Sequence, residues 1–344
     1  MKIGIVTVYN TYNCGSFFQA YALSETLKKE GDEVYFCKRR LDKTQKFTYR
    51  MLLCAKYLVK GDFEVCKNIF TGYFAYKKLR NGQKTVENCD GLDVVVYGSD
   101  TIWNMDDPEF KNNWKKYWGY GVKSKKITYS ASVASTSAEK ILNRQELVES
   151  LSEFSGLALR DEYTYDVVKK ALPQRDDLVR TVDPTMLLDA EEYNVFDKGC
   201  KERDFILFYI YQKLPENILN QVKEYAKKNG KKLIAFGNYD WADINLPADP
   251  FSFISYYKKA DFVVTNTFHG NMFAILFGKK FVNYGIEKKK IQSLLSEFGL
   301  SHCLINENDD ILSVIEKPID YETVKEKIKE KRNESIGYLK SHLN

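Results

Sequence analysis

His269 is the residue whose sequence position is most typical of a proton-transferring group. It stands after the apolar run 261–265 and a short polar turn, and it precedes Gly270 and an apolar segment. This pattern predicts a buried strand, a turn and a helix, with the imidazole at the turn. An imidazole titrates near neutral pH and can serve as a general acid or base. A lone histidine is more often structural, so the prediction depends on this strand-to-helix setting.

Arg160 is a candidate for anion binding, because it directly follows a short apolar strand expected at 156–159. A guanidinium group at the end of a strand can clamp a carboxylate or a phosphate through two parallel hydrogen bonds. The alternative is a structural salt bridge to Asp161, Glu162 or another acid. The two interpretations carry equal weight on these residues alone.

A turn early in the chain combines Asn13, Gly15, Ser16 and Gln19 after the first apolar strand. Backbone N–H groups at the start of the following helix could bind an anion there. An ordinary capped turn uses the same residue types, so neither interpretation is favoured.

A second turn, residues 98–104, brings Ser99, Asp100 and Trp103 together after another apolar strand. These side chains could line a sugar or carboxylate pocket. Alternatively, Ser99 and Asp100 cap the next helix while Trp103 packs in the core. The residues by themselves slightly favour this second interpretation.

The elements that position these residues alternate between strand and helix. Strands are expected at 2–8, 33–37, 92–97, 126–132, 156–159, 178–182, 204–210, 232–236, 261–265 and 280–283. Helices are expected at 17–30, 162–171, 215–229, 251–258, 270–277, 287–298 and 321–339. Two such runs, joined near residue 200, predict an α/β protein with two units, each a parallel sheet covered by helices. Ligands of such sheets bind beyond the carboxyl ends of the strands, where the four groups above lie.

The length of 344 residues agrees with two domains. Residues 1–198 are expected to form an N-terminal domain with a basic, aromatic insertion at about 42–86. Residues 199–320 are expected to form a C-terminal domain. Residues 321–344 are expected to form an amphipathic helix that packs back on the N-terminal domain.

Composition excludes several classes of protein. The net charge of +5 is spread over the whole chain, unlike the basic stripe of a nucleic-acid-binding protein. No segment approaches the ~18–20 apolar residues of a membrane helix, and the start lacks the pattern of a signal peptide. The seven cysteines are odd in number and show no CxxC spacing, which argues against a disulfide framework and a zinc site. We expect a cytoplasmic protein with no nucleic-acid partner and no integral membrane segment.

Six blocks of the chain together resemble the polysaccharide pyruvyl transferase family. In order, they are NTYNCGSFFQAYALSETL, DVVVYGSDTIWN, ITYSASVAS, LALRDEY, TVDPTMLL and ADFVVTNTFHGNMFAILFGKKFV. The resemblance runs from residue 3 to about residue 283, and residues 40–90 show none.

The resemblance implies two Rossmann-like domains that face each other across a cleft, as in GT-B glycosyltransferases. It also implies transfer of the enolpyruvyl group of phosphoenolpyruvate to a sugar of a cell-surface polysaccharide or its lipid-linked precursor, in exopolysaccharide biosynthesis. The product would be a pyruvate ketal. Phosphoenolpyruvate would be the co-substrate, with no metal and no other cofactor.

The resemblance also assigns roles to residues. His269 and Arg160 would be catalytic. The donor and substrate would be bound by residues of the turns described above and their neighbours, namely Asn13, Gly15, Ser16, Gln19, Ser99, Asp100, Trp103, Ser130, Thr267, Phe268, Gly270 and Asn271.

The chain departs from some relatives at the turn before His269. Those relatives have Arg-Leu-His, whereas this chain has Thr267-Phe268-His269. The missing cation would have to be supplied from elsewhere, and Lys258 and Lys259 are candidates.

Two other functions are consistent with the same sequence. A GT-B-type glycosyltransferase would use a nucleotide sugar in the same cleft, and a non-catalytic module would bind a surface glycan or a partner. The insertion at 42–86 could touch a lipid-linked acceptor through a peripheral membrane contact. A solvated helical face is the favoured interpretation of that insertion. The sequence makes no prediction of the oligomeric state.

Overall fold

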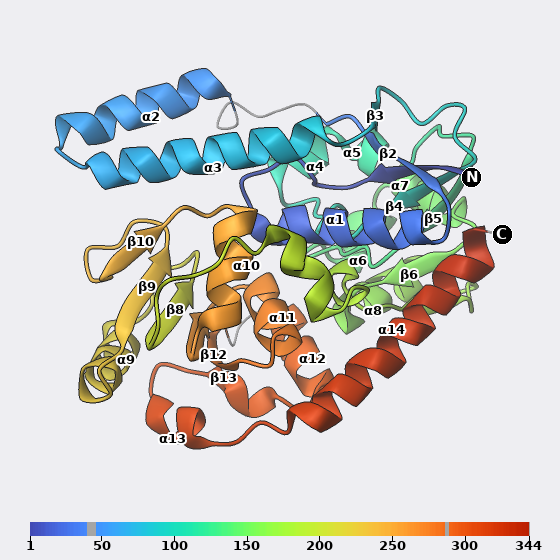
Figure 1. Cartoon of the computed structure of the whole chain (residues 1–344). Coiled ribbons are helices and arrows are strands. Elements are labelled where there is room, and N and C mark those ends of the chain that lie inside the picture. The colour runs from blue at the N-terminus through green and yellow to red at the C-terminus, as the bar shows by residue number, and fades with distance from the viewer. Residues whose placement is uncertain (40–45, 286–288, 344) are drawn as a thin grey trace.

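The computed structural model describes residues 1–39, 46–285 and 289–343, and it contains parallel sheets with helices on their faces (Figure 1). The first sheet has the strand order β3-β2-β1-β4-β5. Its strands are β1 (Lys2–Val6), β2 (Glu33–Cys37), β3 (Thr85–Val86), β4 (Val94–Tyr97) and β5 (Lys125–Thr128). A parallel pair, β6 (Leu157–Leu159) and β7 (Leu178–Arg180), continues this sheet through single bridges from Ile127 to Gly156 and from Ala131 to Leu159.

The second sheet has the strand order β10-β9-β8-β11-β12-β13. Its strands are β8 (Phe205–Tyr209), β9 (Lys232–Phe236), β10 (Ile244–Leu246), β11 (Phe262–Thr265), β12 (Lys280–Tyr284) and β13 (Leu304–Ile305). The strands of both sheets pair in parallel, which confirms the predicted α/β class. In each sheet the chain order reverses beside the first strand, between β1 and β4 and between β8 and β11. Such a reversal leaves a crevice at the carboxyl ends of the strands.

Helices connect and cover the strands. The longer ones are α1 (Cys14–Lys29), α2 (Phe47–Val59), α3 (Phe63–Asn81), α8 (Glu162–Ala171), α9 (Glu216–Lys228), α10 (Pro250–Lys259), α11 (Phe268–Leu276), α12 (Lys289–Glu297) and α14 (Tyr321–Leu343). The shorter ones are α4 (Pro108–Asn112), α5 (Trp114–Tyr117), α6 (Ala138–Leu142), α7 (Gln145–Ser152), α13 (Ile311–Glu316) and the 3₁₀ turns η2 (Pro184–Met186), η3 (Ala190–Phe196) and η4 (Ser301–Cys303).

The two sheets share one hydrophobic core across their interface. Phe18 on α1 lies 5.1 Å from Phe273 on α11 and 5.6 Å from Phe253 on α10, measured between ring centroids. Phe196 of η3 packs edge-on against Phe18, with the ring centroids 5.2 Å apart. Fully buried aromatic rings contribute several kcal/mol each to the free energy of unfolding. The start of α1 is therefore held firmly against the start of α11.

Helix α14 runs from the second sheet back to the first (Figure 1). At its beginning, the Tyr321 hydroxyl donates to the carbonyl of Lys279 beside β12. Further along, Ser335 Oγ accepts the N–H of Val182 beyond β7 at 3.1 Å. Near its end, Lys340 pairs with Glu30 after α1. The helix thus contacts both sheet units.

Several predicted elements coincide with the observed ones, and others differ for local reasons. Strands 33–37 and 232–236 and helix 162–171 have the predicted bounds. The helix expected at 17–30 begins at Cys14, because the Asn13 side chain accepts the N–H of Ser16 and caps it. Helix α12 covers part of the helix expected at 287–298, of which residues 287 and 288 lie outside the described residues.

The insertion expected at about 42–86 is mostly an antiparallel pair of helices, α2 and α3. A helix and a loop were expected throughout this insertion. Its last residues instead form β3 at the edge of the first sheet, where they pair with Phe36 and Cys37. Residues 42–45 of the predicted insertion lie outside the described residues. Among the described helices, none has the length and apolar character needed to cross a bilayer.

Candidate active site

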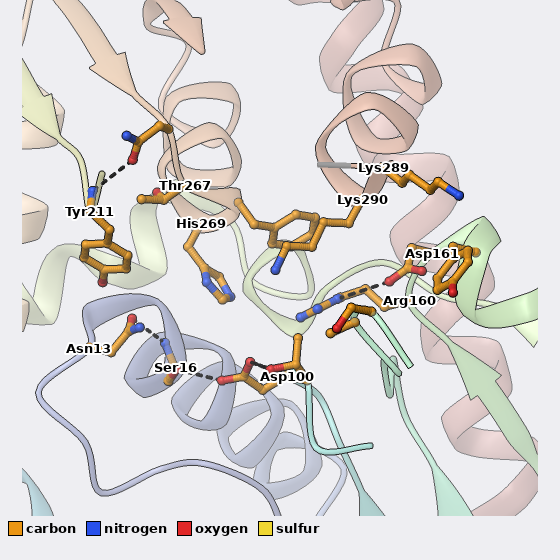
Figure 2. Close-up of a pocket in the computed structure, with 16 residues that line it drawn as sticks. Asn13, Ser16, Asp100, Arg160, Asp161, Tyr211, Thr267, His269, Lys289 and Lys290 are labelled. Carbon is orange, nitrogen blue, oxygen red and sulfur yellow. Dashed lines mark hydrogen bonds and ion pairs between the residues drawn. The ribbon is translucent and has the colours of Figure 1, made fainter. Parts of the chain in front are cut away.

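A cavity of about 650 Å³ lies at the carboxyl ends of both sheets (Figure 2). The first sheet unit contributes Asn13 and Ser16 at the start of α1, Asp100 after β4 and Arg160 after β6. The second unit contributes the turn that contains His269. The cavity therefore brings together residues from Asn13 to Lys290, at the carboxyl ends of the strands where ligands of open α/β sheets bind.

His269 is held in the first turn of α11. Thr267 is the N-cap, and its hydroxyl accepts the Gly270 N–H at 2.9 Å. The helix therefore begins at Phe268, two residues before the predicted start at residue 270. The N–H groups of Phe268 and His269 fall in the first turn, where a helix offers no carbonyl partner. They remain available to an anion together with the positive end of the helix dipole.

Arg160 and His269 line the cavity, and with Asp183, which is buried behind them, they form a charge cluster. One oxygen of Asp183, Oδ2, lies 3.7 Å from a terminal nitrogen of Arg160 and 3.5 Å from Nε2 of His269. The Asp183 side chain is fully buried, and that of Arg160 is nearly so. These distances are ion-pair distances, longer than good hydrogen bonds. Arg160 Nε and Nη2 and His269 Nε2 have no hydrogen-bond partner among the described residues.

Asp183 is fixed and kept ionised by its surroundings. Its Oδ1 accepts the N–H and the hydroxyl of Thr185, at 3.1 and 2.8 Å. Burial by itself would raise the pKa of this carboxyl. The charges of the nearby His269 and Arg160 and the backbone hydrogen bond from Thr185 outweigh burial and lower the pKa of Asp183 to about 2. Asp183 is therefore a fixed negative charge between Arg160 and His269.

Asp100 is a second carboxylate at the cavity. Its Oδ2 accepts the hydroxyl of Ser16 at 2.6 Å, which ties the loop after β4 to α1. Burial would raise the pKa of Asp100, but the charges of Arg160 and His269 hold it below its usual value. The residue has a φ of 74°, in the left-handed region that aspartate tolerates better than most residues.

Gly15 lets the imidazole of His269 reach α1. A Cβ atom at position 15 would lie 2.2 Å from His269 Nδ1 and 2.7 Å from its Cβ. Real Cβ atoms do not come that close to other heavy atoms. The glycine is thus a spacing requirement between the two units.

The cations that complete the cavity are Lys289 and Lys290 at the start of α12. Lys290 Nζ lies 5.8 Å from the ring centroid of Phe268, and the Arg160 guanidinium lies 4.8 Å from the same ring. The prediction that Lys258 or Lys259 supplies the missing cation is wrong, because both lysines lie outside the cavity. Lys258 bonds Asp197 at 2.7 Å, and neither lysine lines the cavity.

Four of the predicted binding residues support the cavity from behind. Gln19 Nε2 donates to the carbonyls of Val8 and Ser16 and fixes the turn before α1. Ser99 Oγ is 3.3 Å from Asp183 Oδ2. Asn271 donates to the Thr267 carbonyl at 3.0 Å. Gly270 has no room for a side chain, because a Cβ there would lie 2.1 Å from Thr265 Oγ1.

Two other predicted binding residues lie away from the cavity. Trp103 is fully buried and stacks on Trp118, with the ring centroids 5.2 Å apart. Its Nε1–H donates to the carbonyl of Tyr117. Ser130 is also fully buried, and its hydroxyl has no partner among the described residues. The structure thus places Trp103 in the core, the interpretation its residue context slightly favoured.

The sequence argument missed Asp183, Tyr211, Asn266, Lys289 and Lys290. Asp183 follows the strand predicted at 178–182, so the rule of inspecting each strand end would have found it. Tyr211 and Asn266 follow β8 and β11, and the side-chain Oδ1 of Asn266 accepts the N–H of Tyr211 at 2.9 Å. The two lysines belong to a run of basic residues, and the spacing of that run does not indicate which of its side chains point into the cavity.

The fold resembles that of solved sugar-nucleotide enzymes. UDP-GlcNAc 2-epimerase of Methanocaldococcus jannaschii is 10% identical, with a TM-score of 0.52, covering 96% of this chain and 92% of its own. The Neisseria meningitidis enzyme bound to UDP-GlcNAc is 13% identical, with a TM-score of 0.52 and coverages of 95% and 94%. An alpha-glucosyltransferase in complex with UDP and DNA is 12% identical, with a TM-score of 0.51 and coverages of 99% and 95%. These likenesses confirm the GT-B-like fold alone.

Comparison with curated proteins gives no match. The profile of the family described as "Polysaccharide pyruvyl transferase" matches residues 13–287, which include every strand-end turn that lines the cavity. This match covers most of the chain and confirms the resemblance of the six sequence blocks. The chain belongs to the polysaccharide pyruvyl transferase family.

Proposed function

We propose that this protein transfers the pyruvyl group of phosphoenolpyruvate to two hydroxyls of one sugar, forming a pyruvate ketal. The observation that carries the proposal is the charge cluster in which Arg160 and His269 line the cavity and the buried Asp183 lies against both. It combines an anion-binding group and a proton-transferring group, the two functions that this reaction needs.

The donor fits the cationic end of the cavity. Phosphoenolpyruvate carries a carboxylate and a phosphate. Arg160, Lys289 and Lys290 lie at one end of the cavity (Figure 2). The first-turn N–H groups of α11 add uncharged donors beside them. Arg160 is the group we assign to the carboxylate, because its planar fork suits that shape.

The acceptor fits the opposite end. Tyr211 and Asn13 lie there, with His269 between them and the lysines (Figure 2). Amide and phenol groups hydrogen-bond sugar hydroxyls, and an aromatic ring packs on the apolar face of a pyranose. The cavity is large enough for a donor and one sugar ring together.

The proton balance of the reaction assigns His269 its role. Ketal formation attaches two acceptor oxygens to C2 of the donor and breaks the C2–O bond to phosphate. One acceptor proton is transferred to C3, which becomes a methyl group, and the other leaves with inorganic phosphate. His269 is the general acid or base of these transfers, and the Asp183 carboxylate lies 3.5 Å from its Nε2. No carbon pair is oxidised or reduced overall, so we expect no redox cofactor.

The acceptor is proposed to be a sugar of a cell-surface polysaccharide or its lipid-linked precursor, consistent with the family. We place the reaction in the cytoplasm at the inner face of the membrane.

Calorimetric titration with phosphoenolpyruvate, beside a panel of nucleotide sugars, tests the proposal. We expect phosphoenolpyruvate to bind, and Arg160→Gln to weaken binding by roughly tenfold to a hundredfold. The matched control is Arg180→Gln, which removes a partly exposed arginine paired with Glu162 and should bind normally. Thermal melting of both variants checks the fold.

A second measurement separates binding from chemistry. His269→Gln should still bind phosphoenolpyruvate but release no phosphate from it in the presence of glycan acceptors. Binding of a nucleotide sugar alone would reject pyruvyl transfer in favour of glycosyl transfer in the same cleft.

A further inference from the structure

The helical hairpin formed by α2 and α3, residues 46–81, projects from the body of the protein (Figure 1). Helix α2 packs on α3, and Cys54 is its one buried residue. Helix α3 joins the hairpin to both units. Tyr76 Oη lies 3.2 Å from Cys14 Sγ, and Asn68 Nδ2 donates to the Asn245 carbonyl of β10 at 2.9 Å.

The outer side of the hairpin is apolar. Of the fifteen large apolar side chains exposed in the described residues, eight lie in this hairpin, although it is about a tenth of the chain. Val59 is 90% exposed, and Leu52 and Phe63 are each 71% exposed. We define the apolar stripe as Phe47, Met51, Leu52, Leu58, Val59 and Phe63. Its α2 members span roughly 140° of the helix circumference. Phe47, at one edge, also packs against Tyr73 of α3 with ring centroids 5.1 Å apart, whereas Leu52 and Val59 are the most exposed. Phe63 lies at the hairpin turn.

The same hairpin carries a concentrated positive charge. Residues 46–81 contain eight lysines and arginines against two acidic residues, a net charge of +6, whereas the whole chain carries +5. The rest of the protein is therefore slightly acidic. Lys56 and Lys60 lie next to the apolar stripe and are both exposed. An exposed apolar strip of this kind marks an interaction site rather than a chance surface.

We propose that the hairpin binds the surface of an anionic lipid bilayer. Helix α2 lies parallel to the membrane, inserts the apolar stripe at the boundary between headgroups and acyl chains, and places Lys56 and Lys60 at the lipid phosphates. At 13 residues α2 is too short to span a bilayer. The hairpin of a second copy is a poorer partner, because it carries the same net charge of +6 and would repel this one.

A contact between the hairpin and the turn before α1 connects the hairpin to the cavity. The guanidinium carbon of Arg50 lies 3.8 Å from the ring centroid of Tyr12. Tyr12 immediately precedes Asn13, the cap of α1 at the cavity. A hairpin resting on a membrane therefore holds the acceptor end of the cavity close to the lipid surface. The proposal itself depends on the hairpin alone and stands whether or not phosphoenolpyruvate is the donor.

Co-sedimentation of the full chain with sucrose-loaded vesicles tests the proposal. Vesicles of phosphatidylcholine and phosphatidylglycerol in equal parts should bind the protein at low salt, and vesicles of phosphatidylcholine alone should bind it at least about tenfold more weakly. Two double variants, Leu52→Glu with Val59→Glu and Lys56→Glu with Lys60→Glu, should each weaken binding at least about tenfold. All four positions are exposed, so we expect unchanged melting.

Matched control variants introduce the same charges elsewhere. Val195→Glu with Leu312→Glu replaces exposed apolar residues, and Lys325→Glu with Lys329→Glu replaces exposed lysines of α14. Both should bind vesicles like the wild type. Absence of binding to anionic vesicles, or equal loss in hairpin and control variants, would overturn the proposal. A dimer in light scattering that Leu52→Glu with Val59→Glu abolishes would assign the stripe to a second copy and also overturn it.

Discussion

A methyl group on Gly15 would lie 2.2 Å from Nδ1 of His269. The two residues belong to different sheet units, so this contact sets how closely α1 and α11 approach. Gly15→Ala should displace the imidazole. The new Cβ would overlap both the ring and the Cβ of His269, so rotating the ring alone cannot relieve the overlap. We expect a fall in kcat of roughly a hundredfold, measured as phosphate release from phosphoenolpyruvate.

The control for this variant is Gly337→Ala in α14, where a new Cβ meets no atom within 4 Å. It should keep full activity and stabilise the helix by up to about 1 kcal/mol. Wild-type turnover in Gly15→Ala would contradict the proposed position of His269 in the reaction.

The charge of Asp183 predicts a loss of stability in acid. Its pKa in the folded protein is about 2, below the usual value near 3.8, so the unfolded chain takes up the proton first as the pH falls. The stabilisation is complete above about pH 4 and is lost as the pH falls through 2. We expect this group to contribute about 2 kcal/mol over that interval.

Urea unfolding of the wild type and Asp183→Asn at stepped pH measures this contribution. The difference in unfolding free energy between them should shrink between pH 4 and pH 2. Asp240→Asn removes an exposed carboxylate, and its unfolding free energy should follow that of the wild type. A constant difference for Asp183→Asn across the interval would show that the carboxylate is not held ionised by its neighbours.

Lys289 and Lys290 should contribute to donor affinity. Removing a cation from an anion site typically costs the free energy of one charge-assisted hydrogen bond. Lys290→Ala should therefore raise the Kd for phosphoenolpyruvate roughly tenfold. Lys289→Ala should have a smaller effect, because this residue is exposed. Calorimetry with Lys258→Ala, whose partner is Asp197, should return the wild-type Kd. An effect of Lys258→Ala equal to that of Lys290→Ala would place the donor elsewhere.

Trp103 should affect stability rather than binding. Trp103→Ala removes a fully buried ring that stacks on Trp118, and it should lower the unfolding free energy by about 3–5 kcal/mol. Trp103→Phe keeps most of the packing and should bind phosphoenolpyruvate with the wild-type Kd. A markedly raised Kd in a stable Trp103→Phe would return this residue to the binding site.

Sequence periodicity predicted most strands and helices of the two sheets because those elements bury one continuous apolar face. Periodicity was less successful at helix starts, because a single capping side chain determines the residue at which a helix begins. Asn13 and Thr267 each extend a helix backward by two or three residues, and this moves His269 from a turn into the first turn of α11.

The site was predictable where its residues follow strands directly. Arg160 follows β6 directly and His269 follows the short turn after β11; both line the cavity, and the buried Asp183 contacts both. The position of Trp103 depends on Trp118, a contact that local spacing does not reveal. The direction in which the Lys290 side chain points depends on how α12 packs, so its place at the cavity was visible only in the tertiary structure.

Helix α14 has a consequence for how the molecule can move. It is bonded to the second unit at Lys279 and to the first unit at Val182 and Glu30, so it acts as a splint across the joint between the two halves. A hinge opening of the cleft would have to detach one end of this 23-residue helix. We therefore expect this helix to limit the separation of the two halves and to couple the unfolding of one half to that of the other.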